Sequence, residues 1–192
     1  MNDKIKIIKT EILSDNWYVL KKVTYEYLKD GEWKKQTREA YDRGNGATIL
    51  LYNKENKTII LTRQFRMPSF INGNETGMLI EACAGLLDKD NPEDCIKRET
   101  EEETGYKISH VQKIFEAYMS PGSVTEILYF FVAEYTASMK VNEGGGVEEE
   151  QEHIEVLEIT IDKAMQMITT GEIRDAKTIM LLQYAKLNAL FD

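Results

Sequence analysis

The sequence predicts a mixed α/β fold. Runs in which apolar and polar residues alternate indicate several β-strands. A glutamate-dense segment between a proline and a glycine indicates a helix, and two segments near the C-terminus place their apolar residues on one helical side. The chain has 192 residues, the length of one domain or of one domain with an appendage. A chain of that size buries roughly 70% of its unfolded surface, so it needs no disulfide or structural metal to fold.

Residues 1–43 are expected to form a small antiparallel β subdomain, followed by a main domain at 44–192. Asp30-Gly31 is a hairpin signal between the second and third of three expected strands, 4–8, 17–27 and 33–41. Three strands alone are close to the limit of independent stability. We therefore expect this subdomain to pack on the rest of the chain or on a second copy of it.

The main domain is expected to consist of strands joined by loops and to end in two helices. Its apolar and alternating runs predict strands at 47–52, 58–66, 78–83, 110–119, 126–135 and 154–159. The segment 67–77 is rich in Gly, Asn and Pro and is expected to be a loop. The segment 141–151, rich in Gly and Glu, is expected to be a mobile, solvated loop. Helices are expected at 160–170 and 177–191, the first ended by Gly171.

The composition excludes several classes of partner. There are 24 basic and 33 acidic residues, and the net charge of −9 argues against binding of nucleic acid or of an anionic membrane. Cys83 and Cys95 form no CxxC motif, which is typical of reduced thiols in the cytosol. The N-terminus lacks the apolar core of a signal peptide, and no apolar run approaches the ~18 residues of a membrane span. We therefore expect a cytoplasmic protein that binds neither nucleic acid nor membrane.

A further helix, rich in glutamate, is expected between Asn91 and Gly105. Pro92 suits the first helical turn, where its missing N–H has no partner to lose. Asn91 precedes it as an N-cap, and Gly105 tolerates the left-handed conformation that ends helices.

Three glutamates of this helix share one face. Glu99, Glu102 and Glu103 have the spacing i, i+3 and i+4, whereas Glu101 points elsewhere. Three like charges at contact distance repel one another unless a cation joins them. Ligands that offer only oxygen favour a hard cation, Mg²⁺ or Mn²⁺, over zinc. A solvated acidic helix without metal is the alternative.

The run 98–105, RETEEETG, resembles the second half of the Nudix box, and Gly85 corresponds to the first glycine of that box. Three features differ from the family pattern. Asn91 occupies the position of an early glutamate, the spacing to Arg98 is one residue shorter, and Thr100 replaces an apolar residue. The resemblance implies the Nudix α/β/α sandwich, with a mixed sheet between helices and an N-terminal antiparallel β subdomain.

The resemblance extends beyond the box to bacterial GDP-mannose hydrolases of this family. It is carried by the runs 39–48, 62–66, 120–122 and 171–177. It implies hydrolysis of the pyrophosphate bond of a nucleotide sugar, releasing a nucleoside monophosphate and a sugar 1-phosphate. An ADP-ribose pyrophosphatase and a ligand-sensing Nudix module without catalysis are the alternatives.

The resemblance also implies a metal site for Mg²⁺, with Mn²⁺ as a substitute. The implied ligands are Glu99, Glu103, Glu152 and the carbonyl of Ala84, with Glu102 close by. Arg98 would orient the glutamates through charge-assisted hydrogen bonds.

A glutamate of the later loop is expected to act as the catalytic base. The run 152–156, EHIEV, favours Glu152, whereas counting forward from the glycines favours Glu150. Glu148 and Glu149 are further candidates, so the choice stays open.

The substrate contacts implied by the resemblance come from several parts of the chain: Trp17, Arg38, Glu39, Arg66, Gly85, Leu86, Glu126 and Lys177. Arg66 would hold phosphate and Trp17 would stack on the base. For Arg66, Glu126 and Lys177 the alternative is an ordinary surface charge. The resemblance further implies a homodimer with exchanged N-terminal subdomains, in which Trp17 and Arg38 complete the nucleotide site of the partner.

Overall fold

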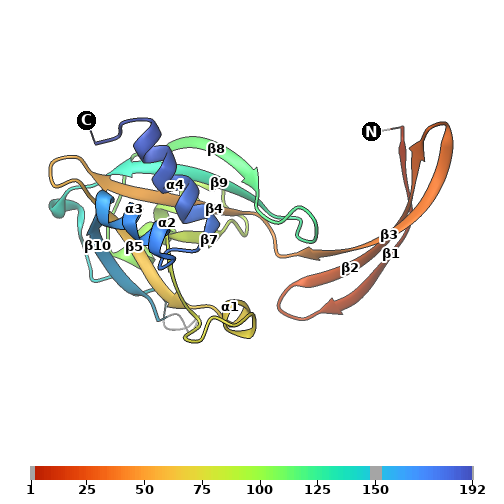
Figure 1. The fold of residues 1–192 in the computed structure, drawn as a ribbon, viewed down its shortest axis with the longest axis horizontal. Helices are drawn as coiled ribbons and strands as arrows, with labels where there is room; N and C mark the ends of the chain where they lie inside the picture. The colour runs from red at the N-terminus through yellow and green to blue at the C-terminus, as the bar shows by residue number, and fades with distance from the viewer. Residues whose placement is uncertain (1–2, 148–152, 192) are drawn as a thin grey trace. The chain divides into compact units, whose positions relative to one another are not determined.

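The computed structural model describes residues 3–147 and 153–191. The chain divides into two compact units. The first consists of Met1–Asn45 with Tyr118–Ile127, and the second of Gly46–Ala117 with Leu128–Asp192. Each unit has its own β-sheet (Figure 1).

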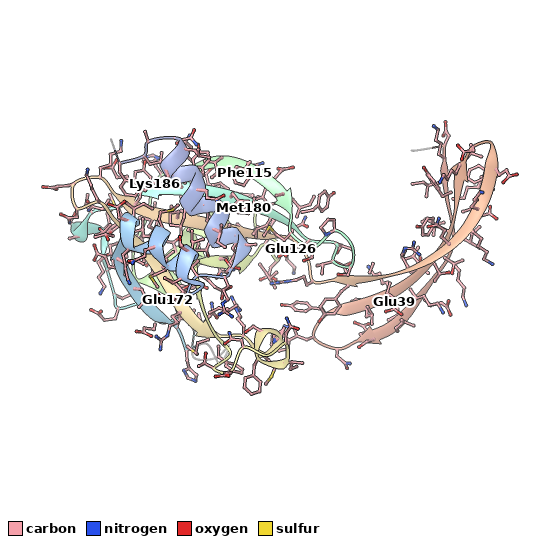
Figure 2. The ribbon with its side chains drawn as sticks, in the orientation of Figure 1. Glu39, Phe115, Glu126, Glu172, Met180 and Lys186 are labelled. Atoms are coloured by element: carbon pink, nitrogen blue, oxygen red, sulfur yellow. The ribbon has the colours of Figure 1, made fainter. Side chains whose placement is uncertain are left out.

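The first unit is a three-stranded antiparallel sheet in the order β1-β2-β3, formed by Ile5–Asp15, Val19–Lys29 and Glu32–Asp42. The expected hairpin is confirmed: Asp30 and Gly31 both have positive φ, 54° and 82°, as a two-residue turn between twisted strands requires. Side chains project from both faces of the sheet (Figure 2). No residue of the three strands is buried, so the sheet has no core of its own.

The segment Tyr118–Ile127 joins this sheet at β3. The backbone N–H of Tyr41 donates to the carbonyl of Ser123 at 2.7 Å, and the N–H of Thr125 donates to the carbonyl of Tyr41 at 3.1 Å. Asp42 accepts hydrogen bonds from the Thr125 hydroxyl at 3.1 Å and from Lys21 at 2.6 Å. A segment far away in the sequence thereby becomes part of the first unit.

The second unit contains a mixed sheet in the order β10-β5-β4-β9-β8, with β6 paired to β5 and β7 to β4. The central strand β4 runs antiparallel to β5 and parallel to β9. The strands are β4 Gly46–Asn53, β5 Thr58–Phe65, β6 Met78–Glu81, β7 Ala84–Leu86, β8 Gln112–Tyr118, β9 Ile127–Glu134 and β10 Glu155–Thr160. The expected mixed sheet with an N-terminal antiparallel sheet is therefore confirmed.

Helices pack on this sheet through its alternating side chains. Ile49 and Leu51 of β4 share a core cluster with Cys95 and Ile96 of helix α2, Pro92–Thr104. The intervening Leu50 is also fully buried and faces the other side of the strand. Two further helices pack here: α3, Ile161–Thr170, contacts β10, and α4, Ala176–Leu187, contacts β4.

Four details correct the sequence-based expectation. The expected loop 67–77 contains a short helix, α1 at Met67–Ile71, and a 3₁₀ turn lies at Ala137–Met139. The expected strand 78–83 ends two residues early, as β6, and a separate short strand, β7, follows at residues 84–86; β6 pairs with β5 and β7 with β4. The last helix ends at Leu187, where Asn188 is the C-cap. In the part of the chain that the structure describes, no helix has the length and hydropathy to cross a membrane.

Candidate active site

Helix α2 forms as its sequence predicts. The Asn91 side chain accepts hydrogen bonds from the backbone N–H groups of Glu93 at 3.1 Å and Asp94 at 3.0 Å. Gly105 ends the helix in the left-handed conformation, with φ 78°. The residue that stands in place of the family's early glutamate is therefore the N-cap of the helix.

Thr100 is a polar residue on the buried face of α2. It is fully buried, and its hydroxyl donates to the carbonyl of Ile96 one turn earlier at 2.6 Å. That bond satisfies the polar group inside the core, so a threonine is accommodated where the family pattern has an apolar residue. Glu103 is buried on this helix as well, whereas Glu99 and Glu102 are partly exposed.

Arg98 connects two of these glutamates. Its Nη2 lies 3.0 Å from an oxygen of Glu99, and its Nη1 lies 2.8 Å from an oxygen of Glu102. Partial burial would lower the pKa of Arg98, but the two carboxylates outweigh it and raise that pKa. The arginine is thus a permanent positive charge between Glu99 and Glu102.

Glu99 and Glu103 lie against the backbone of β7. Glu103 is 2% exposed, and one of its oxygens accepts a hydrogen bond from the N–H of Ala84 at 3.3 Å. A Cβ added to Gly85 would overlap the carboxylate of Glu99, so a larger residue at this position would force the Glu99 side chain to move. Two carboxylates therefore gather beside residues 84 and 85.

The glutamates and the Ala84 carbonyl offer oxygen ligands, which suit Mg²⁺ or Mn²⁺. Within residues 3–147 and 153–191, no three acidic, histidine or cysteine side chains converge closely enough to form a complete metal site. Arg98 engages Glu99 and Glu102 in this structure. The other expected ligand, Glu152, and the alternative base, Glu150, lie outside the described residues, as do Glu148 and Glu149.

The glycine run before these loop glutamates is attached to the C-terminus of α2. The N–H of Gly145 donates to the carbonyl of Glu103 at 2.9 Å, and the N–H of Gly146 donates to the carbonyl of Glu102 at 3.1 Å. The N–H of Ile154 returns to the carbonyl of Gly145 at 3.1 Å. The backbone of the glycine run therefore satisfies the last carbonyls of the helix, a contact that composition did not predict. Residues 141–143, which precede the run, are exposed, as expected for a solvated loop.

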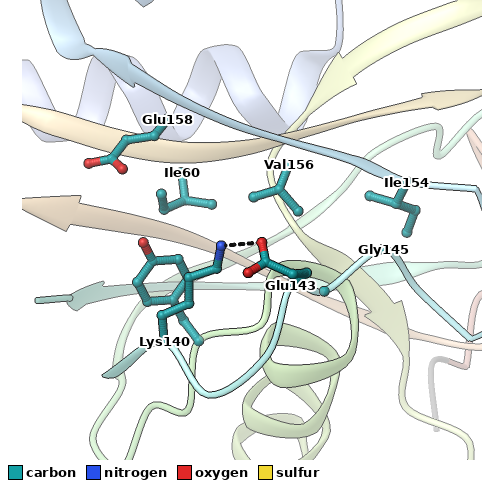
Figure 3. A pocket seen from close by; sticks show the side chains of 9 residues that line it. Ile60, Lys140, Glu143, Gly145, Ile154, Val156 and Glu158 are labelled. Carbon is teal, nitrogen blue, oxygen red and sulfur yellow. Dashed lines mark hydrogen bonds and ion pairs between the residues drawn. The ribbon is translucent and has the colours of Figure 1, made fainter. Parts of the chain in front are cut away.

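A cavity of about 440 Å³ lies beside this glycine run. Figure 3 shows Ile60, Val156 and Ile154 on one side of it and the ion pair of Lys140 and Glu143 on the other, at 2.6 Å. None of the residues that line it belongs to the expected site.

Arg66 and Lys177 meet at a carboxylate that the sequence analysis missed. Glu81, the last residue of β6, accepts from Arg66 Nε at 2.7 Å through one oxygen and from Lys177 at 2.6 Å through the other. Lys177 also lies 3.0 Å from Asp175. The visible signal is a single glutamate inside the apolar run 78–84, MLIEACA.

The electrostatics of this group are strongly coupled. Burial alone would raise the pKa of Glu81, but Lys177 and Arg66 outweigh it and lower that pKa. Burial likewise opposes the charge on Lys177, while Glu81 and Asp175 raise its pKa. The carboxylate of Glu103 is among the charges that raise the pKa of Arg66, which links this group to the glutamate helix.

Four expected substrate contacts belong to the first unit. Trp17 is 83% exposed, and Glu126 forms an ion pair with Arg43 at 3.7 Å. Arg38 and Glu39 line a cavity of about 680 Å³ together with the segment 121–125. Glu39 and Glu126 are labelled in Figure 2.

Leu86 is an expected substrate contact in the second unit. Its carbonyl accepts a hydrogen bond from the Cys95 thiol at 3.1 Å.

Comparison with known proteins identifies the family. Residues 42–182 match the family model described as NUDIX domain. The chain belongs to the Nudix family. Enzymes of this family hydrolyse pyrophosphate bonds and use divalent metal ions, so the predicted enzyme class is confirmed.

The N-terminal part has a match of its own. Residues 4–41 match a model described as GDP-mannose pyrophosphatase NudK N-terminal domain. Curated relatives include the GDP-mannose pyrophosphatases of Escherichia coli O1:K1 / APEC, Escherichia coli O157:H7 and Shigella dysenteriae serotype 1 (strain Sd197). Each is 56% identical over 193 residues, which cover 100% of both chains.

Proposed function

We propose that this Nudix enzyme hydrolyses GDP-mannose to GMP and mannose 1-phosphate with Mg²⁺. The observation that carries the proposal is the similarity to GDP-mannose pyrophosphatases over the whole chain, including the N-terminal part outside the Nudix domain. Similarity confined to the Nudix domain would not indicate which substrate the enzyme hydrolyses.

The free thiols Cys83 and Cys95 support a cytoplasmic location.

The chemistry requires negative charge to be neutralised. A pyrophosphate repels a water nucleophile, and more charge develops on the leaving phosphate as the bond breaks. Glu99, Glu103, Glu152 and the Ala84 carbonyl would hold Mg²⁺, with Glu102 nearby. When bound, the metal neutralises phosphate charge and lowers the pKa of water.

The protein's own groups orient the reactants. Arg98 fixes the carboxylates of Glu99 and Glu102 through the contacts described above. A loop glutamate, Glu152 or Glu150, accepts the proton of the attacking water. Gly85 and Leu86 border the reacting phosphates through their backbone.

Arg66 and Lys177 bind the diphosphate. Arg66 is 41% exposed at its side chain, so its guanidinium is accessible to a ligand although it is bound to Glu81. Guanidinium and ammonium groups are well suited to phosphate oxygens.

The N-terminal subdomain, residues 1–43, serves dimerisation and substrate recognition. Its strands bury no residue, and exposed aromatic side chains such as Trp17 and Trp33 commonly mark an interface. The second unit has an exposed apolar patch of its own at Phe65, Met67, Phe70 and Ile71. A homodimer with exchanged subdomains would cover such surfaces, and it would let Trp17, Arg38, Glu39 and Glu126 serve the site of the partner.

The test is identification of products from a panel of nucleotide sugars with Mg²⁺. We expect GMP and mannose 1-phosphate, with GDP-mannose giving the highest kcat/KM. A higher kcat/KM for ADP-ribose would replace the proposed substrate with the alternative one. Binding without turnover of any panel member would instead identify a ligand-sensing module.

A further inference from the structure

Glu81 connects two cations that come from different elements. It is 4% exposed at the end of β6, Arg66 is the N-cap residue of α1, and Lys177 lies in the first turn of α4. Each carboxylate oxygen takes one cation, at 2.7 Å and 2.6 Å. The spacing of the two basic groups is therefore set by the width of one carboxylate.

The surroundings hold Glu81 in place. The N–H of Ala82 donates to the Thr178 hydroxyl at 2.7 Å, and that hydroxyl donates to Asp175 at 2.6 Å. Asp175 also caps α4 by accepting from the N–H of Thr178 at 2.9 Å. The end of β6 is thereby fastened to the start of α4, three residues before Ala84.

This arrangement is more elaborate than stability requires. Burying charges is costly, and apolar residues of similar volume often stabilise an interior equally well. Two cations and two carboxylates, Glu81 and Asp175, nevertheless occupy this place. Arg66 uses Nε for Glu81, and its side chain is 41% exposed.

We infer that Glu81 is a positioning residue that holds Arg66 and Lys177 as one paired anion-binding unit for the diphosphate of the substrate. This inference rests on the proposed function, because it takes Arg66 and Lys177 as the phosphate contacts. Glu81 itself bears the same charge as the substrate and acts only through the two cations.

Removing the charge of Glu81 has a second consequence. The charged groups around Lys177 are Glu81 from β6 and Asp175 at the start of α4, with Arg66 on the far side of Glu81. Burial lowers the pKa of Lys177, and the two carboxylates raise it. Without Glu81, the pKa of Lys177 falls, and the ammonium loses its proton at a lower pH.

The test variant is Glu81→Gln, which keeps the shape of the side chain and removes its charge. We expect KM for the nucleotide sugar to rise by about 10- to 100-fold, the scale on which partners of buried charge pairs act. We expect kcat to change much less. The alkaline limb of kcat/KM should move to lower pH by about one unit or more, since nearby charges shift a pKa by about that amount.

Two further variants separate positioning from loss of fold. Glu81→Asp keeps the charge on a shorter side chain, so it should raise KM while leaving the alkaline limb close to that of the wild type. Asp162→Asn removes an exposed partner of another α4 lysine, Lys186, at 2.6 Å, and should change neither KM nor the limb. Circular dichroism of each variant checks that it is folded.

Binding of inorganic pyrophosphate, measured by calorimetry in the presence of Mg²⁺, gives a readout that does not depend on the sugar. Weaker binding by Glu81→Gln than by wild type supports the inference even if GDP-mannose proves to be the wrong substrate. A folded Glu81→Gln protein with wild-type KM, pH profile and pyrophosphate affinity would overturn it. Should neither Glu81 variant fold, Lys177→Met decides, because unchanged pyrophosphate affinity in it contradicts the paired unit.

Discussion

The strands β2 and β4 show how differently the two units of this chain are built. In β4 every residue except Tyr52 is buried, whereas in β2 no residue is buried. The second unit therefore stabilises its own sheet and fixes its candidate catalytic glutamates on a helix anchored in a core. The first unit presents aromatic and charged side chains without a core. Under the proposed function, the second unit carries the chemistry and binds the diphosphate, and the first unit adds contacts to the rest of the substrate.

The largest expected effect tests the proposed catalytic role of the glutamates on α2 in the second unit. Glu103→Gln should lower kcat by at least ~10²-fold, the scale seen when one preorganised electrostatic group is lost. The protein should fold normally, because removing one of three neighbouring negative charges relieves repulsion. Steady-state kinetics and thermal melting measure both quantities. Activity above a tenth of the wild-type value would remove the metal role of α2.

The choice between the loop glutamates comes next. We expect Glu152→Gln to reduce kcat more than Glu150→Gln, because a general base contributes roughly 10²- to 10⁴-fold. The two variants carry the same chemical change two residues apart, so each is the control for the other. An inactive Glu150→Gln protein beside a fully active Glu152→Gln protein would reverse the assignment.

Gly85→Ala tests the packing of the candidate metal site without changing any charge. The new methyl group would displace the carboxylate of Glu99, so kcat should fall by about 10-fold or more, since misplacement of a catalytic group by about 1 Å can lower a rate by about 10²-fold. Half-maximal activation should require more Mg²⁺. An unchanged Mg²⁺ titration would show that the position of Glu99 does not matter.

Trp17→Ala tests the proposed role of the first unit in substrate recognition. Trp17 is 83% exposed, so its removal should leave the melting temperature unchanged. KM should rise by about 10-fold, since stacking on a base contributes about 1–3 kcal/mol. The Mg²⁺ titration should not change. A lower kcat with an unchanged KM would mean that Trp17 acts in the chemical step and would contradict its proposed role in substrate binding.

The next prediction concerns the glycine run and the stability of the protein. Gly144→Ala places a side chain at φ +68° against the backbone of Glu103, and should lower the free energy of unfolding by about 1–3 kcal/mol. Gly73→Ala is the matched control, because it has φ +91° but open space around its Cβ position. Equal melting temperatures for the two variants would mean that the contact with α2 adds nothing beyond backbone strain.

The sequence allowed helix α2 to be predicted because its signals are local. Asn91, Pro92 and Gly105 define its ends within the segment itself, and the spacing of the glutamates follows from helical geometry. Helix α1 has five residues and buries none of them, so no apolar periodicity marks it. The mixed sheet was expected, but the pairing of β6 and β7 with different strands depends on contacts distant in sequence.

The site residues that escaped prediction are those whose partners are remote. Glu81 and Lys177 are 96 positions apart, and no local pattern connects them. The glycine run was expected to be mobile because its composition is that of a loop. Its role depends on carbonyls at the end of α2, and a helix leaves these carbonyls unpaired without specifying which segment will bind them.

The measurement that tests the division of labour most directly is activity after mixing Trp17→Ala and Glu103→Gln subunits. In a dimer with exchanged subdomains, one of the two sites of a mixed dimer combines the intact Glu103 of one chain with the intact Trp17 of the other. We predict that the mixture, at substrate concentrations below KM, is more active than the sum of the two variants measured separately. Activity equal to that sum, with mixed dimers demonstrated by mass spectrometry, would contradict the assignment of chemistry and recognition to different chains.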